Sequence, residues 1–236
     1  MKHEVIEFFS NSDLDSLLED SNRIRDLHWG KVVTYSRKVF VPLTNMCRNT
    51  CSYCTFVKDP NSEEANILTK DQVIDIIQEG QNKGCKEVLF SLGEKPERRY
   101  PIAKRALKKI GFDTMVDYLK EVCQLTLKKS NLIPHVNAGT LSLEDIKKLK
   151  PVTASMGMML ETTSKRLTKK GQPHYACPDK IPVQRIRTLE KAGVMKVPFT
   201  TGLLIGIGET FSERIDALKT INRIHKNHGH IQEVII

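Results

Sequence analysis

Long apolar runs are missing from this 236-residue sequence. The longest uncharged, apolar-rich run, residues 197–208, is far shorter than the ~20 residues that a membrane-spanning helix needs. The N-terminus turns acidic after its first residues and lacks the basic-then-apolar order of a secretory signal peptide. We therefore expect a protein without a membrane span, located in the cytoplasm.

Aromatic residues are also few, at 6% of the chain. The 37 Lys and Arg residues exceed the 28 Asp and Glu residues, and the resulting charge of +9 raises the possibility of a nucleic-acid partner. The basic residues, however, fall on predicted helices and loops, and no aromatic stacking platform is interleaved with them. We therefore do not expect a nucleic-acid partner; the excess charge can instead favour an anionic small molecule or protein partner.

Short apolar runs alternate with helical patterns from residue 38 onward. Capping boxes start two of the helices, Thr69 with Gln72 and Thr210 with Glu213, and Ser142 starts a third, shorter one. Near-continuous apolar strands separated by helices are typical of a parallel sheet with helices packed outside. The pattern predicts an α/β fold, a partial (β/α) TIM-type barrel, whose six parallel strands are residues 38–43, 86–92, 132–136, 152–160, 196–205 and 231–236.

The domain organisation is predicted to be simple, because no composition shift, internal repeat or low-complexity tract marks a second domain. We interpret residues 1–36 as a helical preface with Leu14, Leu17 and Leu18 as its apolar stripe, and residues 37–236 as one core. The sixth apolar strand has no helix after it, and bare apolar edge strands are an aggregation hazard. We therefore expect the core to be incomplete at its C-terminus.

Three cysteines, Cys47, Cys51 and Cys54, directly follow the first predicted strand, at the end where barrel enzymes build their sites. A short loop with this spacing can place three thiolates around one small inorganic core. Three ligands are one too few for a closed zinc site or a fully ligated [4Fe–4S] cluster. A cluster held by three cysteines leaves one iron open to a substrate or cofactor.

Two other interpretations of the cysteine loop stay open. One is a zinc site with three cysteines and either His135 or His174 as the fourth ligand. The other is a set of buried thiols, which the polar residues Arg48 and Asn49 in the same loop disfavour. The remaining cysteines are scattered singly and are interpreted as structural: Cys85, Cys123 and Cys177.

The Cys-x-x-x-Cys-x-x-Cys spacing, with an aromatic residue before the last cysteine, resembles the signature of radical S-adenosylmethionine (SAM) enzymes. The resemblance covers about residues 30–236 and is closest to one branch, the CofG family of 7,8-didemethyl-8-hydroxy-5-deazariboflavin synthases. It implies a radical SAM barrel with a [4Fe–4S] cluster and SAM as cofactors. The segments that carry it are residues 34–40, 51–56, 90–97, 134–139, 155–163 and 198–210.

This resemblance also implies a reaction. An electron from the cluster splits SAM into methionine and a 5′-deoxyadenosyl radical, which takes hydrogen from 5-amino-5-(4-hydroxybenzyl)-6-(D-ribitylimino)-5,6-dihydrouracil. Ring closure and loss of ammonia then give the deazaflavin of coenzyme F(420). The implied partners are a CofH-type sister subunit that makes the substrate and an electron donor such as ferredoxin or flavodoxin. Two alternatives stay open: another radical SAM reaction, such as the CofH-type adduct-forming step, and a zinc-bearing nucleic-acid module.

Site residues follow from the same resemblance. The three motif cysteines would hold the cluster, and the backbone of the turn after the second strand would hold the SAM ammonium, although Leu92 replaces the usual first glycine. The other positions that match SAM-binding motifs are Tyr53, Ser91, Gly93, Glu94, Glu161, Arg185, Gly202 and Gly206.

Each of these positions has a chemical reason. Glu161 can accept hydrogen bonds from ribose hydroxyls or pair with the ammonium, and Arg185 can clamp the SAM carboxylate, with Arg187 as its rival. The glycine motif at Gly202 and Gly206 and the ring of Tyr53 would border the adenine. His135 and Asn137, after the third strand, are predicted to point toward the barrel mouth as candidates for substrate binding or proton transfer.

Overall fold

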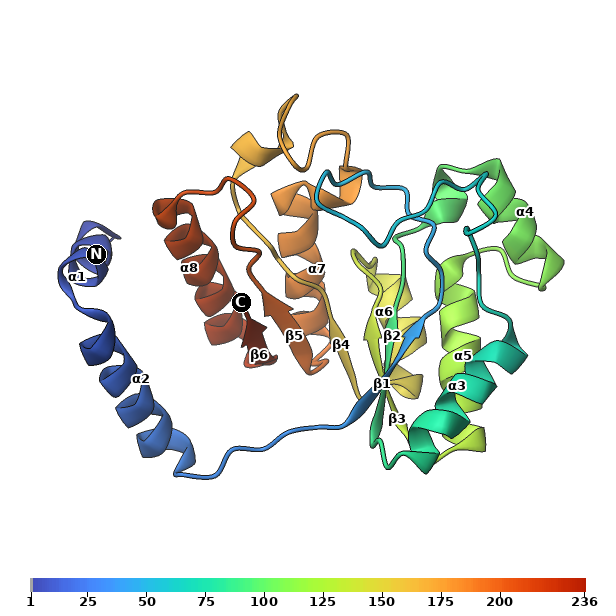
Figure 1. The fold of residues 1–236 in the computed structure, drawn as a ribbon, viewed down its shortest axis with the longest axis horizontal. Helices are drawn as coiled ribbons and strands as arrows, with labels where there is room; N and C mark the ends of the chain where they lie inside the picture. Colours follow the sequence, from blue (N-terminus) through green and yellow to red (C-terminus); the bar gives the residue numbers. More distant parts are fainter. Residues whose placement is uncertain (1) are drawn as a thin grey trace.

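The structure is a computed structural model that describes residues 2–236. Its centre is one six-stranded sheet in the order β1-β2-β3-β4-β5-β6, in which each strand runs parallel to its neighbours (Figure 1). The strands are β1 (Lys38–Pro42), β2 (Glu87–Ser91), β3 (Ile133–Asn137), β4 (Ser155–Gly157), β5 (Phe199–Gly202) and β6 (Ile231–Ile235). The predicted six parallel strands are confirmed, although β4 is much shorter than predicted: Val152 belongs to a 3₁₀ turn, and residues 158–160 lie beyond the strand.

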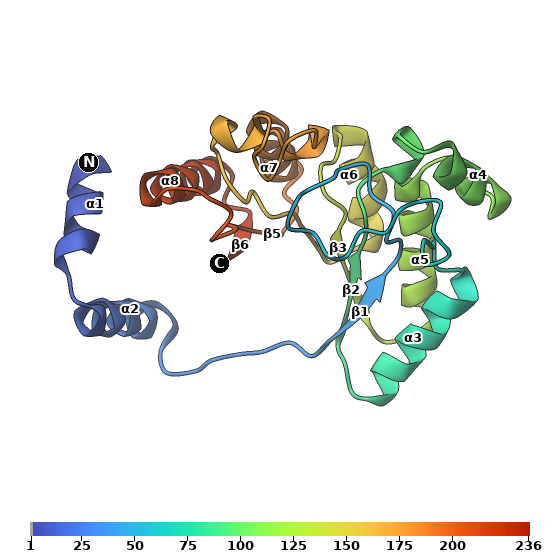
Figure 2. The same ribbon diagram turned by 45° about the horizontal axis from the view of Figure 1, so that its top comes forward.

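Helices cover one face of this sheet, and the sheet curves as part of a (β/α) barrel (Figure 2). The helices between the strands are α3 (Lys70–Asn82), α4 (Pro101–Lys109), α5 (Met115–Lys129), α6 (Leu143–Leu149), α7 (Pro182–Val194) and α8 (Phe211–His228). The core lies between the two layers, where Val41, Phe90, Val136 and Phe199 from four different strands are fully buried. The α/β partial-barrel prediction is therefore confirmed.

Local capping explains where two of these helices begin. The Thr69 hydroxyl accepts the backbone N–H of Gln72, and the Gln72 side chain accepts the backbone N–H of Thr69 in return. Thr210 and Glu213 form the same reciprocal pair at the start of α8. Both predicted capping boxes are confirmed. Each one satisfies backbone N–H groups at the start of its helix that have no partner within the helix.

Two helices precede the sheet, α1 (Lys2–Asn11) and α2 (Leu14–Trp29), and residues 30–37 connect them to β1 (Figure 1). Phe9 packs edge-to-face on Phe211 of α8, with 6.0 Å between ring centroids. Within the described chain α2 buries none of its residues, and Leu14 and Leu18 are mostly exposed. The predicted apolar stripe therefore lies on a helix, as expected, but it does not form a buried packing face. No helix among residues 2–236 combines the length and the apolar character needed to cross a bilayer.

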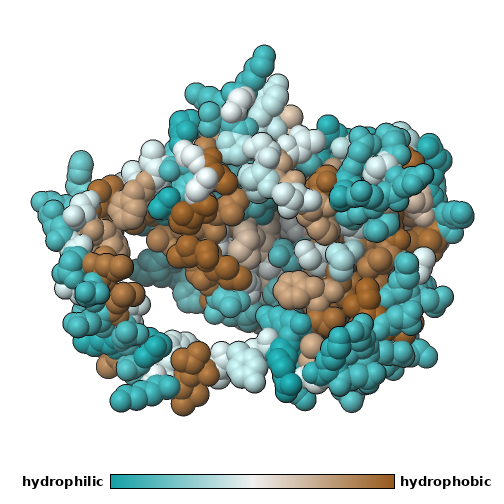
Figure 3. Space-filling view, viewed as in Figure 1, coloured by the Kyte–Doolittle hydropathy of each residue, from teal (hydrophilic) through white to brown (hydrophobic). Residues whose placement is uncertain are grey.

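The face of the sheet away from the helices carries exposed apolar side chains. Phe40 of β1 is 62% exposed and Ile133 of β3 is 50% exposed. Figure 3 shows apolar surface around the hollow beside the sheet. Because all strands are parallel, their carboxyl ends share one edge, and the loops that follow Pro42, Ser91 and Asn137 meet there.

Candidate active site

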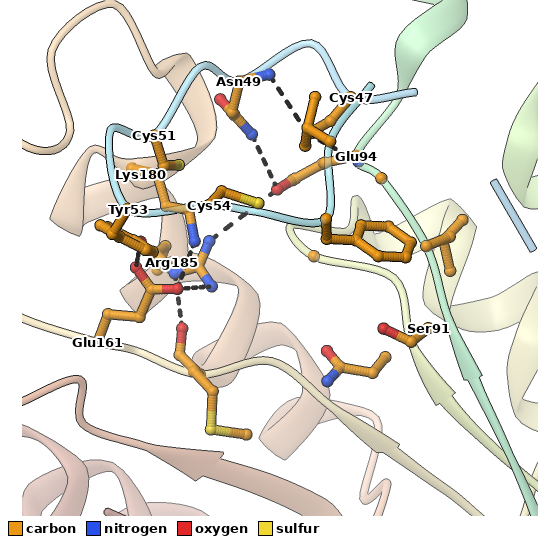
Figure 4. A pocket seen from close by; sticks show the side chains of 17 residues that line it. Cys47, Asn49, Cys51, Tyr53, Cys54, Ser91, Glu94, Glu161, Lys180 and Arg185 are labelled. Atoms are coloured by element: carbon orange, nitrogen blue, oxygen red, sulfur yellow. Dashed lines mark hydrogen bonds and ion pairs between the residues drawn. The ribbon is translucent and has the colours of Figure 1, made fainter. Parts of the chain in front are cut away.

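A pocket with a volume of about 200 Å³ lies at the carboxyl end of the sheet. Figure 4 shows side chains from the β1, β2 and β4 loops and from α7 pointing into it. The structure gathers most of the predicted site residues here: Cys47, Cys51, Cys54, Tyr53, Ser91, Gly93, Glu94, Asn137, Glu161 and Arg185.

The three motif cysteines line one wall of this pocket as free thiols. Cys47 is buried, and its Sγ accepts hydrogen bonds from the backbone N–H groups of Glu94 (3.1 Å) and Asn49 (3.4 Å). Burial raises the pKa of the Cys47 thiol above its ordinary value. Cys51 and Cys54 are partly exposed, and a turn joins them through the Cys54 N–H and the Cys51 carbonyl (3.1 Å). In the described part of the chain no three His, Cys, Asp or Glu side chains converge as a metal site. The three cysteine sulfurs therefore line the same wall of the pocket but do not converge on one point.

Gly93 explains how the β2 turn comes so close to the cysteine loop. A Cβ at this position would lie 2.0 Å from the Met46 carbonyl oxygen and 3.0 Å from the Cys47 Cβ. The Gly93 N–H donates to the Thr44 carbonyl at 2.8 Å, which holds the two segments together. Only glycine fits this approach, so the turn after β2 and the cysteine loop are one packed unit.

Asp179 anchors the same loop from the opposite side. Arg48, between the first two motif cysteines, donates to the Asp179 carboxylate through Nε (2.5 Å) and Nη2. Asn49 donates to it at 3.2 Å, and the Thr140 hydroxyl donates at 2.9 Å. Burial opposes the charge on Asp179, but the hydrogen bond from Arg48 and the charge of Lys95 outweigh it and lower the Asp179 pKa. The conformation of the cysteine loop therefore depends on a carboxylate 130 residues away.

This pKa shift predicts how stability depends on pH. A carboxyl whose pKa is lowered by folding adds stability above its unfolded pKa, near 3.8, and loses that contribution as pH falls through the lower folded value. We expect Asp179→Asn to cost about 2–3 kcal/mol of unfolding free energy at pH 7. The cost should shrink steadily below pH ~4. Urea unfolding across this range measures it, with the exposed Asp113→Asn as the matched control. A cost that does not change with pH would contradict the assignment.

Glu161 is the centre of a charged cluster on the wall facing the cysteines (Figure 4). Its carboxylate accepts a hydrogen bond from the Tyr53 hydroxyl (2.9 Å) and lies 3.1 Å from His174 Nε2. Lys180 contacts it directly, and Arg185 Nη2 lies 3.7 Å away. Burial alone would raise the Glu161 pKa, but the hydrogen bond from His174 and the two cations hold it well below its usual range.

The backbone of Glu161 is also unusual, because its φ of 65° lies in the left-handed region. Non-glycine residues rarely adopt this conformation, and it costs about 1–2 kcal/mol. Two hydrogen bonds hold it: the Glu161 N–H donates to the Gly202 carbonyl at 2.9 Å, and its carbonyl accepts from the Leu204 N–H at 3.1 Å. The fold thus tolerates strain that aims this carboxylate into the pocket.

Arg185 is buried on α7 and joins both walls. Its Nε donates to the Met159 carbonyl at 2.7 Å and its Nη1 donates to the Asp179 carbonyl at 3.1 Å. Nη1 also lies 4.0 Å from Glu94, whose carboxylate accepts the Thr140 N–H at 2.6 Å. The Glu94 side chain is buried. The rival Arg187 is exposed and lies outside the pocket.

Comparison with known proteins identifies the family. Residues 41–221, most of the chain, match the family model of the radical SAM superfamily. The chain belongs to the radical SAM superfamily.

Within this superfamily the chain resembles deazaflavin synthases. It is 45% identical over 205 residues to the 7,8-didemethyl-8-hydroxy-5-deazariboflavin synthase of Methanopyrus kandleri, covering 87% of this chain and 61% of that protein. It is 43% identical to the synthase of the same name from Methanococcus vannielii, covering 100% and 65%. It is 47% identical to the FO synthase of Nocardia farcinica, covering 95% and 27%. The chain therefore spans less than two thirds of each of these relatives.

Solved radical SAM structures share the fold. The [FeFe]-hydrogenase maturase HydG from Carboxydothermus hydrogenoformans superposes with a TM-score of 0.76 at 21% identity, covering 96% of this chain and 50% of that one. Methylornithine synthase superposes with a TM-score of 0.70 at 16% identity, covering 95% and 61%.

The pocket fits the groups that a radical SAM protein is expected to hold. Three thiols at Cys-x-x-x-Cys-x-x-Cys spacing are suitable ligands for an iron–sulfur cluster, and Cys47 already receives backbone N–H groups of the kind that tune such sulfurs. The opposite wall presents Glu161, Lys180 and Arg185. These side chains offer partners for both the ammonium and the carboxylate of an amino acid.

Three predicted residues lie elsewhere. His135 does not reach the barrel mouth: it sits inside β3, and its Nδ1 hydrogen bonds to the Ser155 hydroxyl at 2.6 Å, outside the pocket. Burial lowers its pKa, as for a histidine held neutral. Side chains two residues apart on a strand share a face but differ in depth, and of the two only Asn137 lines the pocket; a role for His135 in substrate binding or proton transfer stays a prediction.

The two glycines are explained by backbone geometry. A Cβ at Gly202 would lie 2.1 Å from the Ile235 carbonyl oxygen, so this glycine allows β5 and β6 to pair closely. Gly206 has a φ of 89°, and its N–H donates to the Glu209 carboxylate at 3.0 Å in a turn. Neither lines the pocket, and their contact with adenine stays a prediction.

Sequence reasoning missed Asp179 and Lys180, which support the pocket, and named His174 only as a possible zinc ligand. Lys180 and Asp179 come from the loop before α7, and His174 comes from the same loop. None belongs to a recognisable motif, and only the tertiary fold brings them to the cysteine loop. An acidic or basic residue in a long predicted loop is the one sequence feature that could have suggested them.

Proposed function

We propose that the chain is the radical SAM unit of a deazaflavin synthase. Cys47, Cys51 and Cys54 hold a [4Fe–4S] cluster with one open iron, and SAM occupies the pocket between it and the Glu161 wall. The observation that carries this proposal is the pocket itself, which gathers the three thiols and the charged cluster of a chain 43–47% identical to proteins named deazaflavin or FO synthase. We propose residues 37–236 as the core and 1–36 as its preface.

The bound cofactors supply one chemical event: reductive cleavage of SAM to methionine and a 5′-deoxyadenosyl radical. The residues of this chain bind and orient. Arg185 provides a guanidinium for the SAM carboxylate, and Glu161 provides a carboxylate for the ammonium or the ribose hydroxyls. The backbone of the turn at Gly93 lies beside Cys47, where it can bind the ammonium next to the cluster. Tyr53 provides apolar cover with a polar tip.

The proposed substrate is the tyrosine-derived adduct 5-amino-5-(4-hydroxybenzyl)-6-(D-ribitylimino)-5,6-dihydrouracil, and the product, after loss of ammonia, is the deazaflavin of coenzyme F(420). Support comes from the names of the relatives and from Asn137 and Ser91, polar residues that line the pocket. The proposed partners are a CofH-type subunit and a ferredoxin or flavodoxin. The cytoplasm, where thiols stay reduced, is the proposed compartment. Because the chain belongs to the radical SAM superfamily, this proposal takes the place of the alternative of a zinc-bearing nucleic-acid module.

A substrate test separates this reaction from the CofH-type alternative. The cluster-loaded chain should convert the adduct, SAM and a strong reductant into a fluorescent deazaflavin, with methionine and 5′-deoxyadenosine as by-products. Tyrosine with the ribitylaminouracil precursor should give no adduct. The measurement is product fluorescence together with mass spectrometry under anaerobic conditions. Adduct formation from tyrosine without any deazaflavin would overturn the proposal in favour of the alternative.

A further inference from the structure

Cys177 differs from the other scattered cysteines, Cys85 and Cys123, because it lies against the cysteine loop. Its thiol lies beside that of Cys51, and Thr50 contacts it as well. Cys123, by contrast, is fully buried in α5. The interpretation of Cys177 as merely structural is therefore incomplete, and cluster binding by the three motif cysteines leaves its position unexplained.

The contact between these two thiols is built into the backbone. The Ser52 N–H donates to the Pro173 carbonyl at 3.1 Å, and the Tyr53 hydroxyl lies 3.0 Å from His174 Nε2. The Cys177 N–H donates to the His174 carbonyl at 3.2 Å, which fixes the turn that carries the thiol. Two independent hydrogen bonds thus hold the segment around residue 52 against the segment around residue 174, with one cysteine on each.

The two thiols differ in access. Cys51 is partly exposed and lines the pocket described above, so a small molecule that enters the pocket reaches its sulfur. Cys177 is only 3% exposed and lines a different cavity with Ala176 and Pro178. A partly exposed thiol backed by a buried one is the arrangement in which the second thiol resolves a mixed disulfide formed on the first.

We propose that Cys51 and Cys177 form a disulfide when no cluster is bound and a small-molecule disulfide is present. In the first exchange, the Cys51 sulfur bonds to one sulfur of the small disulfide, and the other leaves as a thiol with the proton of Cys51. In the second, the Cys177 sulfur displaces the small molecule from Cys51, and it leaves with the proton of Cys177. The two protein thiols are oxidised and the small disulfide is reduced to two thiols.

The disulfide has a consequence for cluster assembly. The disulfide makes the Cys51 thiol unavailable to the cluster, and a reductant can restore that thiol. Oxidation of a lone thiol beyond the sulfenic acid, by contrast, is irreversible. This consequence rests on the proposed function, because it takes Cys51 as a ligand of the cluster. The disulfide itself rests only on the position of the two cysteines.

Thiol counting and peptide mapping test the pair. The full chain, stripped of its cluster, is incubated with oxidised glutathione under anaerobic conditions. Of its six thiols, two should be lost, leaving four, and a Cys51–Cys177 cross-linked peptide should appear. Cys177→Ser should form no internal disulfide. Cys85→Ser, the matched control, should form the same cross-link as the parent.

Circular dichroism before and after oxidation confirms that the fold persists. A cross-link from Cys51 to Cys47 or Cys54 instead, or six free thiols in the folded parent, would overturn the proposal. Iron uptake then tests the consequence: the oxidised parent should load its cluster only after a reductant cleaves the disulfide. Failure of the fully reduced parent to take up any cluster would refute the proposed function and leave the disulfide map unaffected.

Discussion

Cys54→Ala is expected to lose the iron–sulfur cluster and with it essentially all SAM cleavage, a decrease of at least ~1,000-fold in 5′-deoxyadenosine formation. The reason is that a cluster with three protein ligands has none to spare, and each thiolate both holds an iron and sets the potential of the cluster. Cys54 is partly exposed and lies outside the apolar core, so the fold should persist. Iron and sulfide analysis with a SAM-cleavage assay measures the effect.

Cys85→Ala provides the control for this prediction. Cys85 is also a partly buried free thiol, but it precedes β2 at the opposite end of the sheet from the pocket. This variant should retain the iron content and the SAM cleavage of the parent. Equal iron content in Cys54→Ala and in the control would exclude Cys54 as a ligand.

Glu161→Gln is expected to weaken SAM binding by about 100-fold, which corresponds to about 2.7 kcal/mol. Glutamine keeps the size of the side chain and can still accept the Tyr53 hydroxyl, but it removes the charge that faces Lys180 and Arg185. Two buried cations then lose their counter-ion, and the SAM ammonium or ribose loses its acceptor. Equilibrium binding of SAM to the cluster-loaded protein measures the change.

The cluster should stay intact in this variant, because Glu161 contacts none of the three motif cysteines through a hydrogen bond or ion pair in the described chain. Glu64→Gln is the matched control, since Glu64 is a surface carboxylate paired with Lys58. Its SAM affinity should equal that of the parent. Unchanged affinity in Glu161→Gln would remove Glu161 from the SAM site.

The strands and helix starts were predictable because they depend on local patterns. Apolar runs and capping boxes act within a few residues, so the sheet and the starts of α3 and α8 follow from them directly. The helices before the sheet were predictable too, but the exposure of the apolar stripe on α2 was not, because an amphipathic pattern shows that a helix has an apolar face but not that anything packs on it. The length of β4 was misjudged because an apolar run does not show where strand pairing stops: Val152 closes a 3₁₀ turn, and residues 158–160 continue the apolar run outside the strand.

The site was predictable only in part, for the same reason. The three cysteines lie within eight residues and follow a strand, so the sequence alone places them at the sheet edge. Asp179 and Lys180 reach that edge from far along the chain, and their partners Arg48 and Glu161 are set by the folding of two separate loops. Such pairs depend on tertiary packing, which residue spacing does not encode.

Anaerobic reconstitution tests the central claim most directly. The purified chain, reduced and supplied with iron and sulfide, should bind about four irons and four sulfides and show a broad visible absorption band. After one-electron reduction its paramagnetic resonance spectrum should change when SAM is added, because SAM binds the open iron. A colourless protein that retains zinc, or a cluster whose spectrum is unaffected by SAM, would contradict the account.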